Sequence, residues 1–583
     1  MKAVELSPAA RSRALRELAA GGEVDVLVVG GGVVGAGAAL DAATRGLSVG
    51  LVEARDWAAG TSSRASKLIH GGLRYLEMLD FGLVHEALRE RGLMVRRLAP
   101  HLVRPVPFLY PLSHRVWERP YVGAGVLLYD TMGAAGRASR GLPHHRHLTK
   151  RRTLKVAPGL KPGALVGAVQ YWDAQVDDAR HTMSLVRTAA SYGALVANRA
   201  KVVRYLRDGE RVTGAVVADQ ETGAEIEVRA RQVVAATGVW TDETQALADA
   251  SSVRVRASKG VHLLVPRDRI DSSSGLILRT ERSVLFVIPW GRHWIVGTTD
   301  TDWDLDKDHP AATAADIDYL LEHANRVLAE PLAKDDVEGV YAGLRPLLSG
   351  ASDQTAKLSR EHLVGTPVPG LVVIAGGKYT TYRVMAEDAV DEAVRGLDGA
   401  AVPASVTEDV PLVGADGYRA LWNRRSALAL AAGLPVRRVA QLLRRYGTLV
   451  DEVLDLIAAD PSLAEPLPSG DGYLRAEVVY AATHEGARDV EDVLARRTRI
   501  SIESRDRGTE SAVVAASLMA PVLGWDAERT AREAATYVRL VEAEREAQEQ
   551  PDDLAAANVW LRARKDPRAA GDAGRTGRPE KIA

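Results

Sequence analysis

The sequence predicts an α/β fold with two additions, a β-rich domain interleaved with the first domain and a C-terminal α-helical domain. A strand pattern, a glycine-rich turn and a helix of small residues follow one another near residue 30, as in parallel α/β units. β-branched runs between residues 254 and 299 indicate a second sheet. Beyond residue 410 apolar residues recur at helical spacing with few strand patterns. The length of 583 residues agrees with two or three domains, because single cores rarely grow beyond about 300 residues.

The first unit begins with an apolar, β-branched run, Val26–Val29, that predicts a buried strand. The turn leads into a helix of small residues, Val33–Thr44, and a second apolar run, Ser48–Val52, ends in Glu53. Glu53 stands 23 positions after the first glycine, near the distance of about 20 at which an acidic residue binds the ribose of a dinucleotide. The glycines have G-x-G-x-x-G spacing and are Gly30, Gly32 and Gly35.

This Rossmann-like arrangement predicts a bound dinucleotide. One glycine allows the tight turn, a second lets backbone N–H groups approach a pyrophosphate, and a third lets the helix pack on the strand. Two later pairs, Thr237-Gly238 and Gly376-Gly377, each follow a strand pattern, and we expect these segments to return to the same ligand. FAD is therefore expected rather than NAD, because an NAD enzyme more commonly completes its dinucleotide fold in one contiguous block.

Composition restricts the remaining chemistry. The formal net charge is −1, so we expect no nucleic-acid partner. The absence of cysteine excludes disulfides, thiolate nucleophiles and Cys-ligated metals, and no metal site is expected. The first 23 residues lack the apolar core of a secretory signal, and no run approaches the roughly 20 apolar residues of a spanning helix. We therefore expect a cytoplasmic protein that is peripheral on the inner face of the cell membrane.

The segments between the nucleotide-binding elements mix helices and strands. Helices are expected at Gly82–Leu98, Asp177–Tyr192, Ala314–Leu328 and Thr380–Val394. The apolar stretch Tyr121–Met132 predicts a buried helix rather than a membrane-docking surface, and Arg104–Pro111, with three prolines, predicts a loop. Strands are expected at Ala200–Tyr205, Val212–Ala218, Glu225–Val228, Gln232–Ala236, Val261–Pro266, Val284–Pro289, Trp294–Thr298 and Leu371–Ala375.

These patterns divide the chain into four parts. They are an N-terminal extension (1–24), an FAD-binding Rossmann-like domain with an interleaved β-rich substrate-binding (cap) domain (25–410), a C-terminal α-helical domain (411–550), and a tail (551–583) expected to be disordered at its end. In the helical domain, a solvated helix face is expected to carry Arg496, Arg497 and Arg499. A structural ion pair and helix start, rather than catalysis, are expected of Asp177, Asp178 and Arg180.

Eight motifs then occur in order along the chain. They are TSSRASKLIHGGLRYLE (61–77), YWDAQVDDAR (171–180), AATGVW (235–240), SKGVHLLVPR (258–267), IPWGRHWIVGTTD (288–300), YAGLRPL (341–347), GGKYTTYR (376–383) and THEGARDVEDVLARRTR (483–499). Together they resemble the FAD-dependent glycerol-3-phosphate dehydrogenases of the respiratory, membrane-associated type. The resemblance covers about residues 25–537.

The resemblance implies oxidation of sn-glycerol 3-phosphate to dihydroxyacetone phosphate, with hydride passing from C2 to N5 of FAD and electrons continuing to a quinone. It also implies peripheral contact with the cytoplasmic membrane surface, and a homodimer is compatible with it. The residues agree with this substrate, because a phosphate dianion needs cations. The glycine-containing motifs supply His70, Arg74, Lys259, His262, Arg345 and Lys378.

Individual roles follow by similarity. The resemblance places around substrate and flavin Arg74, Tyr75, His262, Arg345 and Lys378, and Lys259 is included as a substrate-binding cation. The flavin and its phosphates are expected to contact Thr61, Ser62, Ser63, Lys67, Leu68, Thr237, Gly238, Gly377, Lys378 and Thr380. His70 and His262 are both candidates for the base that takes the hydroxyl proton, and the sequence does not choose between them. Arg345 is expected to polarise the substrate oxygen.

Three other functions stay open at this point. A glycerol-3-phosphate oxidase would share the fold and the reductive half-reaction but use oxygen and make peroxide. An amine-oxidising flavoenzyme would share the architecture, although the many cations suit a phosphate better than a carboxylate alone. A scaffold protein with a vestigial nucleotide fold would carry no flavin.

Overall fold

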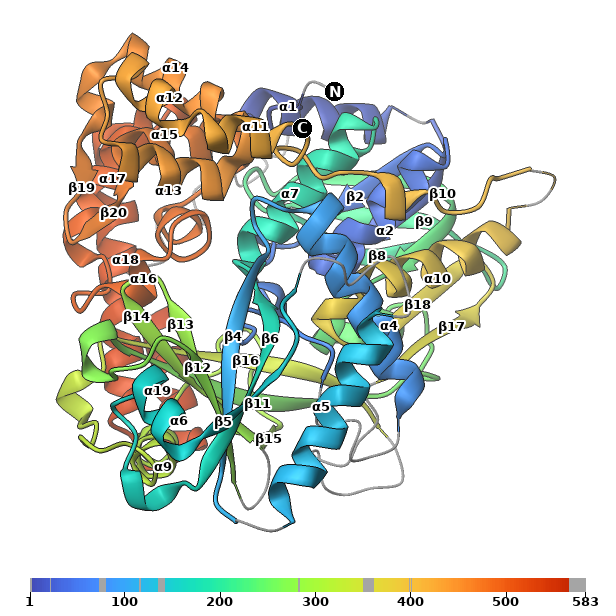
Figure 1. Cartoon of the computed structure of the whole chain (residues 1–583). Helices are drawn as coiled ribbons and strands as arrows, with labels where there is room; N and C mark the ends of the chain where they lie inside the picture. Colours follow the sequence, from blue (N-terminus) through green and yellow to red (C-terminus); the bar gives the residue numbers. More distant parts are fainter. Residues whose placement is uncertain are drawn as a thin grey trace, which may run out of the picture.

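The nucleotide-binding part of the molecule is a sheet whose five central strands run parallel in the order β18–β10–β1–β2–β7 (Figure 1). The computed structural model describes residues 3–20, 22–72, 80–114, 117–134, 142–280, 284–349, 361–397, 399 and 401–565. The parallel strands are β1 (Val24–Val29), β2 (Val49–Val52), β7 (Leu195–Ala197), β10 (Glu225–Ala235) and β18 (Leu371–Gly376), and β17 (His362–Val368) is antiparallel at the edge. β1 and β10 thus place the first strand pattern beside one from 200 residues later.

Alternate residues of β1 enter two different cores. Val26 and Val28 pack with the helices α2 (Val33–Thr44), α7 (Asp178–Ser191) and α10 (Tyr382–Arg395). Leu27 and Val29 pack with α1 (Pro8–Ala19) and with the antiparallel strands β8 (Ala200–Asp208) and β9 (Arg211–Asp219). The predicted N-terminal extension is therefore part of the core of this domain. Because both faces of the parallel sheet are covered, its strands are continuous apolar runs.

The β-rich domain is a second sheet, in the order β15–β11–β14–β13–β12–β4–β6–β3 with β16 beside β11 and β5 beside β6. Its strands are β3 (Leu68–Ile69), β4 (Arg104–Leu112), β5 (Arg146–Thr149), β6 (Gly167–Gln175), β11 (Val255–Pro266), β12 (Gly275–Arg279), β13 (Val284–Trp290), β14 (His293–Gly297), β15 (Thr301–Trp303) and β16 (Gly339–Leu348). The helices that accompany it are α4 (Phe81–Leu93), α5 (Glu118–Ala134), α6 (Lys150–Val156) and α9 (Ala314–Asn325), whereas α8 (Thr241–Ala246) packs on β10 and β18 of the first sheet. The sheet is assembled from two parts of the chain, β3–β6 and β11–β16, which are separated by β7–β10 of the first sheet, as expected for an interleaved domain.

The helix predicted at Tyr121–Met132 is present as α5, but it is buried on one face only. Val122, Val126 and Tyr129 are buried, whereas Leu127 and Leu128 are exposed. The prediction of a buried helix is therefore wrong for the outer face.

The loop predicted at Arg104–Pro111 is wrong, because these residues form β4. β4 pairs along its whole length with β6, and with β12 only across Phe108 and Leu109. The prolines fall at alternate positions, 105, 107 and 111, so their missing N–H groups all lie along the same side of the strand. A strand that pairs fully on one side only can accept them.

The C-terminal domain is helical, as predicted, and lies at the upper left of Figure 1. Its helices are α11 (Tyr418–Asn423), α12 (Arg425–Ala431), α13 (Val436–Tyr446), α14 (Val450–Ala459), α15 (Arg475–His484), α16 (Ile500–Glu503), α17 (Thr509–Leu523), α18 (Ala527–Gln548) and α19 (Asp553–Lys565), with a hairpin of β19 (Pro466–Leu467) and β20 (Gly470–Leu474). α19 occupies the first part of the predicted tail and packs on α18 through Ala547 and Val559. In the described part of the chain, no helix has the length and apolar character needed to cross a membrane.

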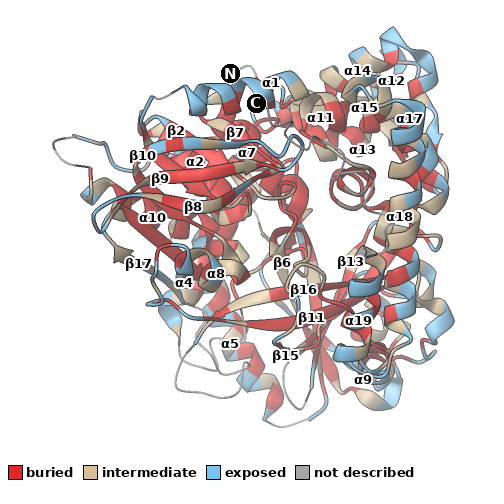
Figure 2. Cartoon of the chain, turned by 180° about the vertical axis from the view of Figure 1, so that it is seen from behind, coloured by how far each residue is buried: buried red, intermediate tan, exposed pale blue. Residues whose placement is uncertain are grey.

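The solvated face predicted for the arginines of this domain is also wrong. Arg496 and Arg497 bind Asp56 of the nucleotide-binding domain, and Arg499 binds Asp177 and Asp178. All three arginines are buried at the domain boundary. Figure 2 shows the buried residues continuing from the parallel sheet into the helical domain. The expectation that Asp177 and Asp178 serve structure is confirmed, since Asp177 caps α7 and both carboxylates pair with Arg499.

Candidate active site

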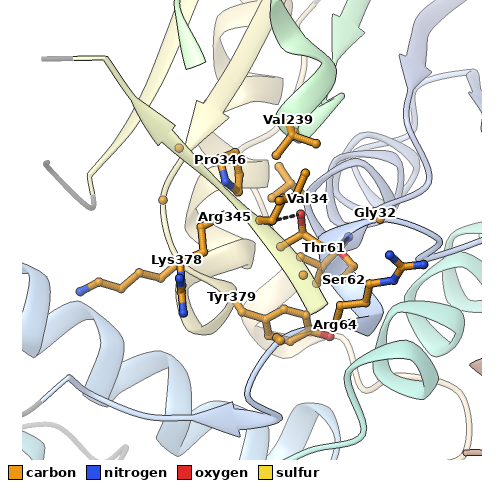
Figure 3. Close-up of a pocket in the computed structure, with 18 of the residues that line it drawn as sticks. Gly32, Val34, Thr61, Ser62, Arg64, Val239, Arg345, Pro346, Lys378 and Tyr379 are labelled. Carbon is orange, nitrogen blue, oxygen red and sulfur yellow. Dashed lines mark hydrogen bonds between the residues drawn. The ribbon is translucent and has the colours of Figure 1, made fainter. Parts of the chain in front are cut away.

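A cavity of about 1320 Å³ lies between the two sheets and extends from the glycine turn to α5. Small-molecule sites are typically about 300–1,000 Å³, so this cavity has room for a dinucleotide together with a small substrate. In Figure 3, Gly32, Thr61 and Ser62 lie on one side of it, and Arg345 and Lys378 extend from the other. Its walls therefore come from both domains, and segments that are far apart in sequence meet there.

The glycine turn is shaped for a close approach. Gly30 has φ +112°, and a Cβ there would lie 2.6 Å from the carbonyl oxygen of Ala236. A Cβ on Gly35 would lie 1.9 Å from the carbonyl oxygen of Gly30, so this glycine serves helix–strand packing and does not line the cavity. The cavity reaches the first turn of α2, whose exposed N–H groups and partial positive charge favour a bound phosphate.

The far end of this cradle suits an adenosine. Glu53 lines the cavity at the end of β2, where its two oxygens accept from the backbone N–H groups of Gly31 (2.6 Å) and Arg55 (2.7 Å). A carboxylate keeps further lone pairs for ribose hydroxyls. The guanidinium of Arg55 lies over the ring of Trp240 at 4.5 Å, and both residues line the same end of the cavity.

The edge of the sheet also fits a polar ligand. Thr237 follows β10, and its buried Oγ1 has no hydrogen-bond partner among the described residues. Gly238 and Gly377 have φ +56° and +77°, conformations that glycine adopts without strain. All three residues line the cavity. A buried hydroxyl without a partner costs about 1–3 kcal/mol, so a ligand that binds it would offset that cost.

The ring of His262 is held in the cavity wall by two contacts. Its Nε2 lies 2.8 Å from Ser66 Oγ, and its ring stacks on Tyr341 with centroids 4.6 Å apart. Burial, together with the charges of Arg345 and Lys67, lowers the pKa of His262 well below 6.5. The imidazole is therefore neutral at neutral pH, and one of its two ring nitrogens carries no proton.

Arg345 is a residue of β16, and its guanidinium is held by the turn that follows β14. Its Nη2 donates to Thr298 Oγ1 (3.1 Å) and to the carbonyl oxygen of Thr299 (3.2 Å), and Nη1 lies 3.4 Å from Asp300. A Cβ on Gly260 would lie 2.6 Å from Arg345 Nη2, so the guanidinium lies against the backbone of β11, two residues before His262. Arg345 and His262 thus line one corner of the cavity from paired strands.

His70 and Lys378 also line the cavity. The backbone N–H of His70 donates to Thr380 Oγ1 (3.1 Å), and this hydroxyl donates in turn to the carbonyl oxygen of His70 (3.2 Å). The exchange ties two segments together that are 310 residues apart in sequence. Lys378 precedes this contact by two residues and adds a cation to the same wall.

Most of the predicted site residues therefore come together. The cavity is lined by Gly30, Gly32, Glu53, Thr61, Ser62, Leu68, His70, Thr237, Gly238, His262, Arg345, Gly377, Lys378 and Thr380. Arg74 and Tyr75 lie outside the described residues.

Four predicted residues do not line the cavity: Gly35, as described above, and Ser63, Lys67 and Lys259. Lys259 is buried on the far side of β11, where its Nζ pairs with Asp316 (2.6 Å) and with Asp553 of α19, so its placement at the substrate is wrong. Residues that alternate along a strand face opposite sides, which separates Lys259 from His262. Lys67 is likewise buried and binds Asp178 (2.9 Å) and the carbonyl oxygen of Ser63 (3.0 Å), so it and Ser63 support the wall from behind.

Sequence reasoning missed several lining residues. The hydroxyl of Ser66 contacts His262, and both Thr298 and Asp300 contact Arg345. The ring of Tyr341 stacks on His262. These four residues lie inside the motifs 61–77, 288–300 and 341–347. Their position in these motifs is the sequence signal that could have identified them. The cavity also has an apolar arm, lined by Phe81, Tyr110, Tyr121, Val122, Ala124, Leu128 and Tyr171, and of these residues Tyr171 alone lies in one of the motifs.

Comparison with family models identifies two regions. Residues 25–388 match the model described as FAD dependent oxidoreductase. Residues 405–530 match the model described as the C-terminal domain of alpha-glycerophosphate oxidase. The first match contains both sheets and the cavity, and the second contains most of the helical domain.

Known proteins are similar along nearly the whole chain. Glycerol-3-phosphate dehydrogenase 2 of Mycobacterium tuberculosis (strain ATCC 25618 / H37Rv) is 58% identical over 555 residues, which is 95% of this chain and 94% of that protein. The mitochondrial glycerol-3-phosphate dehydrogenase of Homo sapiens is 36% identical over 546 residues, 90% of this chain and 74% of that protein. The structure of the glycerol-3-phosphate dehydrogenase from Bacillus halodurans complexed with FAD has a TM-score of 0.76 and 29% identity, and covers 92% of this chain and 98% of its own.

Proposed function

Because the chain belongs to the FAD-dependent glycerol-3-phosphate dehydrogenase family, we propose that it oxidises sn-glycerol 3-phosphate to dihydroxyacetone phosphate and passes the electrons to a quinone. The cofactor is FAD, and the prediction of FAD is confirmed. The observation that carries the proposal is one continuous cavity. It joins the dinucleotide cradle at Gly30 to a neutral histidine, His262, and to a fixed arginine, Arg345.

The residues of the cavity fit FAD. Its pyrophosphate would lie at the glycine turn and the first turn of α2, and its ribose at Glu53. Thr237 would find a partner for its buried hydroxyl, and Gly238 and Gly377 leave space for the ring. When bound, FAD supplies the oxidant that accepts the hydride equivalent from the alcohol carbon.

We assign to His262 the role of the base that takes the proton of the substrate hydroxyl. Its lowered pKa keeps the imidazole neutral, and Ser66, which lines the cavity, lies 2.8 Å from Nε2 and can pass the proton to it. Arg345 would stabilise the negative charge that develops on the oxygen as the proton leaves. Lys378, which also lines the cavity, would attract the phosphate dianion as a point charge.

A quinone is the proposed acceptor because the apolar arm of the cavity suits an apolar ring and tail better than water. The protein would then work peripherally on the inner face of the cell membrane, where quinones are dissolved. A homodimer remains a prediction that sedimentation of the holoenzyme would test.

The test is anaerobic addition of glycerol 3-phosphate to the holoenzyme, followed by an acceptor. We expect the flavin absorbance to bleach and a short-chain quinone to restore it. Failure to bleach would overturn the dehydrogenase proposal. Rapid reoxidation by oxygen with one peroxide per substrate would instead favour the oxidase alternative, and turnover of amines but not glycerol 3-phosphate would favour an amine-oxidising enzyme.

A further inference from the structure

Part of the wall at the adenosine end of the cavity comes from residues 304–309, which follow β15 and form neither helix nor strand. Asp308 lines the cavity there, and its carbonyl oxygen and carboxylate lie 3.4 and 3.5 Å from Nη1 of Arg55. Lys307 binds Glu243, another lining residue, at 2.7 Å. Two ion pairs therefore join this segment to the rest of the wall around the adenosine.

These two ion pairs are weak restraints by themselves. Glu243 is 55% exposed and Asp308 is 33% exposed at the side chain, and ion pairs in contact with water add little stability. Only the start of the segment has a firm base, because Trp303 is buried and its Nε1 donates to the carbonyl oxygen of Asp306 (3.0 Å). The end of the segment needs support from elsewhere in the chain.

Helix α19 provides that support from behind. The ring of Trp560 stacks on His309, with centroids 4.7 Å apart and planes 13° from parallel. The carbonyl oxygen of Gln550, in the turn before α19, accepts from the N–H of Ala314 at the start of α9 (3.0 Å). Both views place α19 close to α9 (Figures 1 and 2). Ala311 is buried among apolar residues of α18 and α19, namely Ala543, Ala547, Ala556 and Val559.

A buried lysine joins the first residue of α19 to the same place. Lys259 Nζ donates to Asp316 (2.6 Å), to the carbonyl oxygen of Ala311 (3.3 Å) and to Asp553 of α19. Asp316 also accepts from the N–H and the hydroxyl of Thr313 and thereby caps α9. Because Asp316 already neutralises Lys259, the charge of Asp553 is not needed to bury the lysine. What Asp553 adds is a connection between α19 and residues 311–316.

The direction of these contacts argues against a helix that merely covers α18. The apolar residues Ala556 and Val559 would serve that purpose. The polar group of Asp553 and the ring of Trp560 are instead directed at Lys259 and His309, beside the wall of the adenosine end.

We propose that α19 is a latch for FAD, in which Asp553 and Trp560 hold residues 304–309 in place at the adenosine end of the cavity. Neither residue lines the cavity, so both are positioning residues. A short segment with few buried side chains can open locally, and contacts at its end raise the free energy of that opening. Loss of either contact should therefore let FAD leave faster. This inference concerns retention of FAD and depends on neither the substrate nor the electron acceptor.

The test is the rate at which diluted holoenzyme releases FAD, followed by the fluorescence of free flavin at a urea concentration well below the unfolding midpoint. Trp560→Ala should speed release about two- to tenfold, the range expected for loss of one aromatic pair. Trp560→Phe keeps a ring on His309 and should stay within about twofold of the parent. Asp553→Asn should speed release about tenfold, as for loss of one hydrogen bond between charged groups.

Two truncations test the whole helix. Ending the chain after Asp552 removes α19 and should speed release at least as much as either point variant. Ending it after Lys565 keeps α19 and should leave the rate unchanged. The point variants decide the question if the shorter chain does not fold.

The matched control is Leu554→Asn, next to Asp553 at a position that is 60% exposed, and it should release FAD as the parent does. Hydrogen exchange on the same holoenzymes supplies a second readout. In Trp560→Ala we expect faster exchange in residues 304–313 and unchanged exchange in α2. The latch is misassigned if Trp560→Ala and Asp553→Asn release FAD at the parent rate, or if Leu554→Asn releases it as fast as they do.

Failure of this inference can be told apart from failure of the proposed function. Bleaching by glycerol 3-phosphate, measured per bound flavin, should be equal in the parent and in Trp560→Ala, because Trp560 lies outside the cavity. A parent that holds FAD but does not bleach would count against the proposed function and leave the release rates to decide the role of α19.

Discussion

The imidazole of His262 lies flat on the ring of Tyr341, with the ring planes 8° from parallel. The two residues face each other directly in the β11–β16 ladder, so strand register sets the stack. Tyr341 donates its hydroxyl to the carbonyl oxygen of Ala65 (3.0 Å), and the next residue, Ser66, binds Nε2 of His262. The histidine is therefore fixed by contacts from two other segments of the chain, β16 and residues 65–66.

Replacing His262 by Gln should lower the rate of flavin reduction by glycerol 3-phosphate about 10²–10⁴-fold, because general-base catalysis contributes that much. FAD should stay bound, since its cradle is formed by other residues. Stopped-flow absorbance measures both. His70→Gln is the comparison, and a larger loss in that variant would transfer the role of base to His70.

The position of the ring can be tested without changing the histidine. A Cβ on Gly297 would lie 2.3 Å from Cδ2 of His262, which stacking on Tyr341 prevents from moving away. Gly297→Ala should therefore slow flavin reduction at least about tenfold, because small misplacements of catalytic groups are costly. Gly163→Ala, at a position with open space around it, should have no effect. Equal rates in the two variants would contradict this geometry.

Arg345→Lys should keep the charge but lose the forked hydrogen bonds to Thr298 and Thr299. We expect flavin reduction to slow by about 10²–10³-fold, as for loss of a group that stabilises developing oxyanion charge. The measurement is kcat against substrate concentration, together with the flavin content of the purified protein. Loss of flavin with normal chemistry in the remainder would show that Arg345 supports the cofactor instead.

The pH dependence of stability should follow two buried histidines. Burial lowers the pKa of His101 and of His181 to about 3, whereas both titrate near 6.5 in the unfolded chain. Below pH 6.5 the unfolded state binds more protons, so the free energy of unfolding falls by about 1 kcal/mol per pH unit for each histidine. Urea unfolding from pH 7 to 5 measures this slope. His101→Asn should make it shallower, and an unchanged slope in that variant would contradict the assignment.

Arg499→Ala should destabilise the protein by about 3–5 kcal/mol. The change leaves the buried carboxylate of Asp178 and the partly buried carboxylate of Asp177 without their shared cation, and breaking a buried pair costs about that much. The midpoint of urea unfolding reports it. Arg532→Ala removes an exposed pair with Glu528 and should change the free energy of unfolding by less than about 0.5 kcal/mol.

The local sequence pattern was sufficient to predict the first helix and the second strand of the nucleotide-binding unit. The helix predicted at Val33–Thr44 has those bounds in the structure, and the strand predicted at Ser48–Val52 differs from β2 by one residue. Such elements are specified by consecutive residues, a continuous apolar run and a glycine turn. The predicted fold class is confirmed for the same reason, since each domain has its own pattern.

Patterns that depend on a neighbour were less informative. The three prolines of β4 predicted a loop because nothing in the segment shows that only one side of the strand is fully paired. The arginines 496, 497 and 499 predicted a solvated face because their carboxylate partners lie more than 300 residues away. Burial of a charge follows from its partner, and sequence does not reveal that partner.

The sequence by itself determined the dinucleotide cradle and the motifs that supply cations to the substrate. Only the tertiary structure decided which cations face the cavity. Lys259 and His262 are three residues apart on one strand, yet Lys259 pairs with Asp316 behind the sheet, whereas His262 faces the cavity. The reason is physical: a strand turns alternate side chains to opposite faces, and the packing of the other domain decides which face becomes the wall of the site.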